Sequence, residues 1–286
     1  MCSIFGTNIE NKDLIKRLGI AGESKGKDAT GIATSHGGLL DVFKEPVRAE
    51  WFGWDIVKDG SDFYLGHTRF STQGDPKQNE NNHPFLSKDE SFVLAHNGII
   101  WNDWELNESW GLPQSSIKTD SYVIVQMLEL VKFMYSKGRL TLEIIKEVCE
   151  LLKGSFTLTI MDDRGQLFLL RHDNPLYYMF DGENLIYAST KYMLNSAVEK
   201  SGIKFNSMIG EIPENTIYQF DTIHKKFIGN ETFKPKKYNY KKKYKNNDKV
   251  VDISTKRNQN NNLPIITGAS GTKNRIGFKT EMKISS

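Results

Sequence analysis

The sequence predicts an α+β fold that combines two β-sheets with a layer of helices. The order of the segments carries this prediction, because one group of strand-like segments precedes two amphipathic helices and a second group follows them. The chain has 286 residues, of which 38% are hydrophobic and 11% aromatic, which is enough for one sizeable core. The sequence contains no internal repeat.

The first group of elements is predicted from two kinds of apolar spacing. Residues 2–7 alternate around Ile4 and Phe5, as a buried strand does, whereas residues 11–24 carry apolar side chains at near-helical spacing. The Gly-Gly pair at 37–38 lies between two strand-like segments and favours a hairpin. The expected elements are a strand at 2–7, a helix at 11–24, hairpin strands at 29–35 and 39–45, and strands at 62–70 and 91–98 that enclose a polar loop at 71–85.

The helical layer and the second group of strands follow. Residues 121–135 and 140–153 have the spacing of amphipathic helices, and Thr119 or Asp120 is a candidate cap for the first of them. The later expected elements are strands at 155–163, 166–172, 176–180 and 184–190, a helix at 191–199, and strands near 209–212 and 216–220.

The composition divides the chain into a body and a tail. Residues 2–229 are expected to form the folded domain, and residues 1–229 contain 24 basic and 31 acidic groups. Residues 230–286 contain 14 basic and 4 acidic groups, with low-complexity runs such as KPKKYNYKKKYKNN and NQNNN. Such segments bury little apolar surface, so the tail is predicted to be disordered.

The same sequence indicates a cytoplasmic protein. Cys2 and Cys149 are too few for a disulfide framework, which favours a reducing compartment. No apolar run approaches the roughly 18 residues of a membrane span, and the N-terminus lacks the pattern of a signal peptide. We therefore expect no membrane association.

Four short stretches determine the functional prediction: CSIFG (2–6), GHTRFSTQG (66–74), HNGII (96–100) and KTDSYVI (118–124). In this order and spacing they resemble the class II glutamine amidotransferases, the N-terminal-nucleophile family that includes glucosamine-6-phosphate synthase and amidophosphoribosyltransferase. KGKDATG (25–31), NNHPF (81–85) and residues 153–190 resemble further family segments, so that the similarity covers roughly residues 2–222. It implies a four-layer αββα N-terminal-nucleophile fold.

The resemblance implies that Cys2 is the catalytic nucleophile. A second residue as small as Cys permits removal of Met1, which leaves a thiol and a free α-amino group on one residue. A thiolate is a strong nucleophile, and an unperturbed α-amino group has a pKa of roughly 8, close to working pH. Asn97, through its side chain, and Gly98, through its backbone N–H, would then hold the oxyanion of the tetrahedral intermediate.

The remaining site residues would bind the amino-acid end of the substrate. The planar fork of Arg69 suits the α-carboxylate, Asp120 is the family's partner for the ammonium group, and Thr72 and Gln73 line the same pocket by analogy. We expect neither a metal nor a cofactor. His67, His83 and His96 are interpreted as structural, as are Asp28 and the apolar-flanked Cys149.

Two departures from the family pattern leave the subfamily of this chain undetermined. Phe70-Ser71-Thr72-Gln73 is closer to the amidophosphoribosyltransferase pattern than to the Trp-Ala-Thr-His of the glucosamine branch, whereas HNGII and NNHPF favour the latter. Most relatives also continue into a synthase domain, whereas here the basic tail follows.

Three hypotheses follow from this pattern. The first is a glutaminase that delivers ammonia to an acceptor on a synthase or other partner protein. The second is a stand-alone hydrolase of γ-glutamyl amides. The third is an inactive scaffold whose tail, with its interleaved lysines and tyrosines in KKYNYKKKYK, binds nucleic acid.

Overall fold

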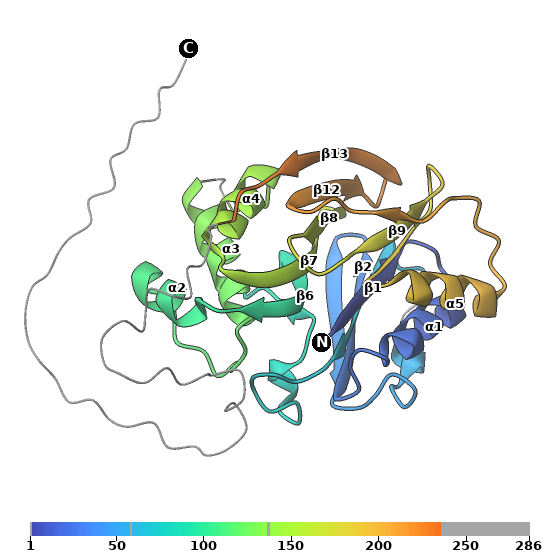
Figure 1. The fold of residues 1–286 in the computed structure, drawn as a ribbon, viewed down its shortest axis with the longest axis horizontal. Helices are drawn as coiled ribbons and strands as arrows, with labels where there is room; N and C mark the ends of the chain where they lie inside the picture. The colour runs from blue at the N-terminus through green and yellow to red at the C-terminus, as the bar shows by residue number, and fades with distance from the viewer. Residues whose placement is uncertain (1, 58, 136–137, 236–286) are drawn as a thin grey trace, which may run out of the picture. The chain divides into compact units, whose positions relative to one another are not determined.

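The computed structural model describes residues 2–57, 59–135 and 138–235. Within them, two antiparallel sheets form the centre of the molecule (Figure 1). The first sheet has the strand order β11-β9-β10-β1-β4-β2-β3. Its strands are β1 (Ser3–Thr7), β2 (Ala29–His36), β3 (Leu39–Glu45), β4 (Phe63–Arg69), β9 (Tyr177–Phe180), β10 (Leu185–Ala188) and β11 (Gly210–Glu211).

The second sheet has the order β13-β12-β8-β7-β6-β5. Its strands are β5 (Phe85–Leu86), β6 (Phe92–Ile100), β7 (Gly154–Asp162), β8 (Gln166–Arg171), β12 (Thr216–Asp221) and β13 (Lys226–Thr232). The helices are α1 (Lys12–Gly22), α2 (Asp103–Trp110), α3 (Tyr122–Tyr135), α4 (Leu142–Leu151) and α5 (Lys191–Ser201), with short 3₁₀ turns at Trp54–Ile56 and Asn79–Asn81.

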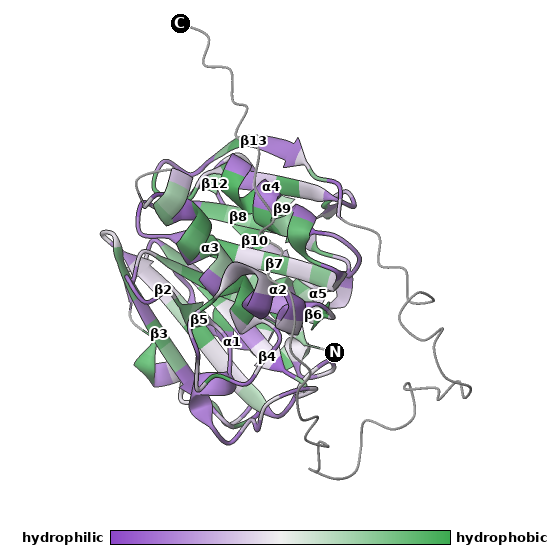
Figure 2. Ribbon diagram, turned by 90° about the vertical axis from the view of Figure 1, so that its left-hand side faces the viewer, coloured by the Kyte–Doolittle hydropathy of each residue, from purple (hydrophilic) through white to green (hydrophobic). Residues whose placement is uncertain are grey.

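Three apolar clusters define four layers. One cluster joins α1 and α5 to the first sheet, and another joins α3 and α4 to the second. The third lies between the two sheets and includes Ile4, Leu65, Val93 and Leu169. Figure 1 shows the two pairs of helices on opposite sides of the sheets, which confirms the predicted αββα arrangement. In Figure 2, β8 is hydrophobic along nearly its whole length, whereas the long connecting loops are mainly hydrophilic.

Side-chain caps lie at the start of three of the helices. The side chain of Asn11 accepts a hydrogen bond from the N–H of Leu14 at the start of α1. Thr141 and Thr190 cap α4 and α5 in the same manner. Each cap satisfies a backbone donor that has no partner inside the helix, and therefore fixes the first turn.

Helix α2 and strand β13 were not predicted, and the reason is the same for both. Helix α2 buries only Leu106, and β13 alternates between exposed and half-buried residues, so neither has the apolar periodicity on which sequence reasoning depends. Strand β13 also crosses the expected domain boundary at residue 229, and Phe233 beyond it is buried against the helical cluster. The folded body therefore includes residues 230–233, while the predicted disorder and nucleic-acid binding of the tail fall almost entirely outside the described residues.

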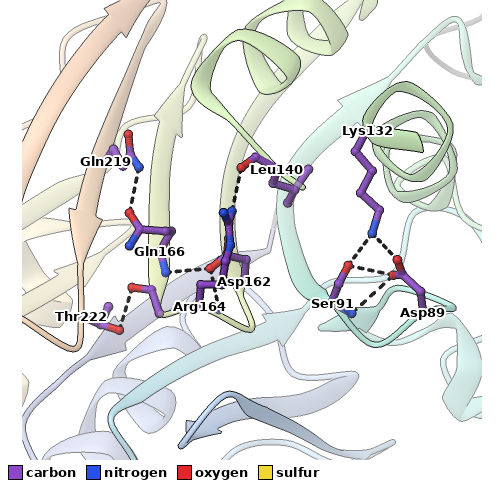
Figure 3. Close-up of polar contacts among 10 residues, drawn as sticks. Asp89, Ser91, Lys132, Leu140, Asp162, Arg164, Gln166, Gln219 and Thr222 are labelled. Atoms are coloured by element: carbon purple, nitrogen blue, oxygen red, sulfur yellow. Dashed lines mark hydrogen bonds and ion pairs between the residues drawn. The ribbon is translucent and has the colours of Figure 1, made fainter. Parts of the chain in front are cut away.

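Two partly buried polar contacts fasten the second sheet to its helices (Figure 3). Lys132 of α3 donates to Asp89, with 2.5 Å between Nζ and Oδ2, and also to Ser91. Arg164 pairs with Asp162 at 2.6 Å and donates to the carbonyl of Leu140, which precedes α4. None of the described helices has the length and apolar character that a membrane crossing requires.

Candidate active site

Three of the predicted site residues project into the space between the two sheets. Side chains alternate across a strand, so each residue can be placed by its neighbours two positions away. Ile4 belongs to the inter-sheet cluster, and Cys2 therefore lies on that face of the first sheet. Arg69 follows Phe63 and Leu65 of the same cluster at even spacing, as Asn97 follows Val93 and Ala95. The alternation thus brings these three side chains to one region.

The thiol of Cys2 lies beside the chain that follows β4. Ser3 pairs with Thr68 in the antiparallel register of β1 and β4. The N–H of Phe70 donates to Sγ of Cys2 at 3.4 Å, and the thiol is 3.5 Å from the Phe70 carbonyl. Burial raises the pKa of this half-buried thiol, while the Phe70 N–H and the charge of Arg69 act in the opposite direction. The thiol therefore needs a base that removes its proton at neutral pH.

Arg69 is a buried cation whose hydrogen bonds end on neutral oxygens. Its side chain is 3% exposed, and Nη1 donates to Oδ1 of Asn82 at 2.7 Å. Nη2 donates to the carbonyl oxygens of Gln73 at 2.5 Å and Gly74 at 3.0 Å. Burial lowers the pKa of Arg69, although Asp28 and Asp120 oppose this shift from a distance. In the described part of the chain no carboxylate forms an ion pair with Arg69, so an anionic ligand would complete its charge pairing.

Asp120 is held against the strand that carries Asn97. It is buried, and its Oδ2 accepts a 2.7 Å hydrogen bond from the backbone N–H of Ile100 at the end of β6. Its negative charge raises the pKa of the Cys2 thiol. The charges of Asp120 and Arg69 therefore both act on the Cys2 thiol, in opposite directions.

Asn97 and Gly98 lie in the part of β6 that has no paired strand on the β5 side, among the residues that the structure describes. Strand β5 pairs only with Val93 and Leu94. The carbonyl of His96 and the N–H of Ile100 both have partners at this edge of β6. Because backbone groups of alternate residues point to the same edge, the N–H of Gly98 faces it too. The side chain of Asn97 is buried, and its amide oxygen has no hydrogen-bond partner in the described residues.

Gly98 cannot be replaced without strain. Its φ is +152°, which non-glycine residues rarely adopt, and an added Cβ would lie 1.9 Å from the carbonyl oxygen of Ser155. The backbone at this position therefore depends on glycine.

The three histidines form a buried group and do not form a metal site. The ring centroids of His67 and His83 are 4.3 Å apart, and those of His83 and His96 are 6.4 Å apart. Burial lowers the pKa of His67 and of His96 to about 3, which keeps both rings neutral. No group of His, Cys, Asp or Glu in the described residues has the arrangement of a metal site. Nε2 of His67 donates to the carbonyl of His96, which joins β4 to β6 across the sheets.

The other predicted residues have different surroundings. Thr72 and Gln73 are exposed, and Gln73 borders a hollow of about 260 Å³ that Lys118 and Thr119 also line. Asp28 accepts a hydrogen bond from the N–H of Ser71, consistent with the structural role expected for it. Cys149 is buried in the helical cluster, where burial raises its pKa well above the ordinary value.

Sequence reasoning did not single out two asparagines that contact the site. Asn82 holds Arg69, and Nδ2 of Asn174 donates to the backbone carbonyl of Asn97 at 3.1 Å and to Oγ of Ser155. Asn82 lies within the NNHPF segment, which was a usable signal, whereas Asn174 lies in a loop between strands and has no sequence signal of its own.

The chain is similar to known proteins of one family. Residues 67–196 match the family model described as glutamine amidotransferase domain. The chain is 34% identical to the glutamine–fructose-6-phosphate aminotransferase (isomerizing) of Staphylococcus aureus over 221 residues. This aligned region covers 73% of this chain and 35% of that protein. The enzyme of the same name from Listeria innocua is 35% identical over 191 residues, covering 64% and 31%. The chain thus spans about a third of the length of these relatives.

The fold has a counterpart among solved structures. The glutamine phosphoribosylpyrophosphate amidotransferase of B. subtilis superposes with a TM-score of 0.63 at 22% identity, over 82% of this chain and 49% of that one. This likeness concerns the fold, and it agrees with the four layers and the N-terminal-nucleophile architecture. Together with the family match and the sequence relatives, it shows that the chain belongs to the class II glutamine amidotransferase domain family.

Proposed function

We propose that this chain hydrolyses the side-chain amide of glutamine through a thioester on Cys2 and supplies the ammonia to an acceptor on a partner protein. The observation that carries the proposal is that Arg69, whose charge acts on the Cys2 thiol, is a buried guanidinium whose hydrogen bonds all end on neutral oxygens. Such a cation favours a ligand that brings its own carboxylate, and glutamine has one.

The proposed reaction begins after removal of Met1. The α-amino group of Cys2 takes the thiol proton as Sγ attacks the amide carbon, and the resulting oxyanion receives hydrogen bonds from the Asn97 side chain and the Gly98 N–H. The C–N bond then breaks as the ammonium group of Cys2 returns its proton to the departing nitrogen, which leaves as ammonia. Water attacks the thioester, and glutamate and the free thiol are released. Arg69 and Asp120 hold the α-carboxylate and the ammonium group of the substrate throughout.

The transfer of ammonia to an acceptor is proposed by analogy with the relatives. The relatives are named for an amino transfer from glutamine to fructose 6-phosphate, yet this chain matches only about a third of their length. Residues 67–196 of this chain match the family domain. We therefore assign the glutamine half of such a reaction to this chain, and we propose that the acceptor binds to a partner protein.

The test is glutamine hydrolysis by untagged protein, with intact mass measured on the same sample. We expect wild type lacking Met1 to release glutamate and the Cys2→Ala variant to release none. Retention of Met1 together with full activity would rule out the α-amino group of Cys2 as the base. A rate of glutamine turnover unaffected by any co-purifying protein would argue against the partner.

A second candidate reaction is hydrolysis of a γ-glutamyl amide larger than glutamine. A hollow of about 750 Å³, lined by residues 23–28 and Phe70, adjoins the chain that contacts the Cys2 thiol. This space favours a leaving amine larger than ammonia. A γ-glutamyl anilide or alkylamide series separates the two reactions, because only the second predicts a higher kcat/KM than glutamine.

A further inference from the structure

Asn82 is fully buried and every polar group of its side chain is paired. Its exposed fraction is 0%, and Oδ1 accepts the 2.7 Å hydrogen bond from Arg69. Nδ2 donates to the carbonyl of Pro76 at 2.8 Å and to Oδ1 of Asn79 at 3.1 Å. Nζ of Lys44 donates to the backbone carbonyl of Asn82 at 2.8 Å. The side chain therefore has a single orientation, because only an oxygen suits Arg69 and only an NH₂ suits the other two acceptors.

The loop that precedes Asn82 closes around the same guanidinium. Arg69 donates to the carbonyls of Gln73 and Gly74, while Asn82 donates to Pro76 and Asn79 farther along the loop. Arg69 and Asn82 thus hold both halves of the loop at residues 73–79. A shift of Asn82 would move the guanidinium and release the loop together.

The neutrality of Asn82 matters as much as its position. A carboxylate at this place would form an ion pair with Arg69 and cancel the charge that a substrate carboxylate needs. An amide oxygen supplies the same hydrogen bond and leaves the positive charge in place. Lys44 contributes a second nearby cation, and burial lowers its pKa to about 8.

We infer that Asn82 is a positioning residue that orients Arg69 for the α-carboxylate of the substrate while leaving the charge of Arg69 uncancelled. The inference rests on the proposed hydrolysis of glutamine and deepens it. Asn82 itself does not touch the reacting atoms. It selects γ-amides that carry a free α-carboxylate over those in which this group is blocked.

The experiment compares kcat/KM for glutamine with kcat/KM for glutamine α-amide, in which the carboxylate is replaced by a neutral amide. The variants are Asn82→Asp and Asn82→Ala. The matched control is Asn8→Asp, because Asn8 is also buried, accepts from the N–H of Leu185 and donates to the carbonyl of Glu183 near β10. Melting temperatures verify that each variant is folded, and calorimetric binding of L-glutamate and L-isoglutamine repeats the comparison without turnover.

We expect Asn82→Asp to lower the preference for glutamine over its α-amide by at least about tenfold, since an ion pair between the new carboxylate and Arg69 removes the advantage of the substrate's α-carboxylate. Asn82→Ala lowers it less, and Asn8→Asp leaves it unchanged. A purely structural role would weaken both substrates equally, and an unchanged preference in both Asn82 variants would overturn the inference. If wild type hydrolyses no glutamine, the proposed function fails, and the preference for L-glutamate over L-isoglutamine in binding still decides the role of Asn82.

Discussion

The backbone N–H of Ile100 donates a 2.7 Å hydrogen bond to Oδ2 of Asp120. This contact fixes the candidate partner of the substrate ammonium to the strand that carries Asn97 and Gly98, the candidate oxyanion donors. The two ends of a bound glutamine would therefore be held relative to one another by one rigid strand, β6. Such coupling is how a site converts binding into correct orientation of the reacting amide.

Replacement of Asp120 should therefore affect substrate binding. Asp120→Asn keeps an oxygen for the Ile100 N–H but removes the negative charge, so we expect KM for glutamine to rise roughly 10- to 100-fold, the equivalent of one charged hydrogen bond. The measurement is steady-state glutaminase kinetics, with the exposed Asp163→Asn as the control. A KM within twofold of wild type would exclude Asp120 from ammonium binding.

Replacement of Gly98 should affect the chemical step. In Gly98→Ala the new Cβ meets the carbonyl oxygen of Ser155 at 1.9 Å, and the backbone must move away from its φ of +152°. We expect kcat to fall by about 10² to 10³, the usual result of losing one oxyanion donor. Gly229→Ala is the control, because its Cβ would meet no atom within 4 Å. Normal kcat in a folded Gly98→Ala variant would contradict the assignment.

The elements that the sequence predicted share a strong apolar period. Strands β1, β4 and β6 alternate between two buried environments, and α1 and α4 present a continuous apolar face, so local pattern and tertiary packing agree. Helix α2 and strand β13 bury few side chains, and they form because the surrounding structure holds them rather than because of their own pattern.

The residues of the candidate site also fall into those that the sequence predicted and those that it did not. The resemblance located Cys2, Arg69, Asn97 and Asp120, which lie respectively just before β1, on β4, on β6 and in the segment before α3. The contacts of Asn82 depend on a loop whose path is set by Arg69 and by residues 73–79. The spacing of apolar residues does not predict the path of this loop, because its hydrogen bonds join side chains to backbone groups across an irregular segment.

The two cysteines should differ in reactivity with iodoacetamide. Cys2 is half-buried, whereas Cys149 is fully buried and has a pKa well above its ordinary value. We expect one label on native wild type, none on native Cys2→Ala, and two on unfolded wild type, as measured by intact mass. Because burial also raises the pKa of Cys2, its labelling rate should keep increasing with pH through pH 8. Labelling of native protein at Cys149 would contradict the buried packing of α4.

The contact between Asp89 and Lys132 should make stability depend on pH in the acid range. Lys132 is buried in α3, and its hydrogen bond helps to lower the pKa of Asp89 from 3.8 to about 2 against the opposing effect of burial. A carboxyl whose pKa is lower in the folded state stabilises that state above its unfolded pKa, and this contribution is lost as the pH falls from about 4 to about 2. Asp89 is 53% exposed, so solvent reduces the effect.

We expect Asp89→Asn to lower the free energy of unfolding by about 1–2 kcal/mol at pH 7, because Lys132 keeps its buried charge and loses this carboxylate. The difference from wild type should diminish as the pH falls below about 4 and should nearly vanish near pH 2, where Asp89 is increasingly protonated in both states. Urea unfolding at pH 7, 4 and 2 measures it, and the exposed Asp173→Asn is the control. A destabilisation that stays constant over this range would show that lost packing, rather than the ion pair, is responsible.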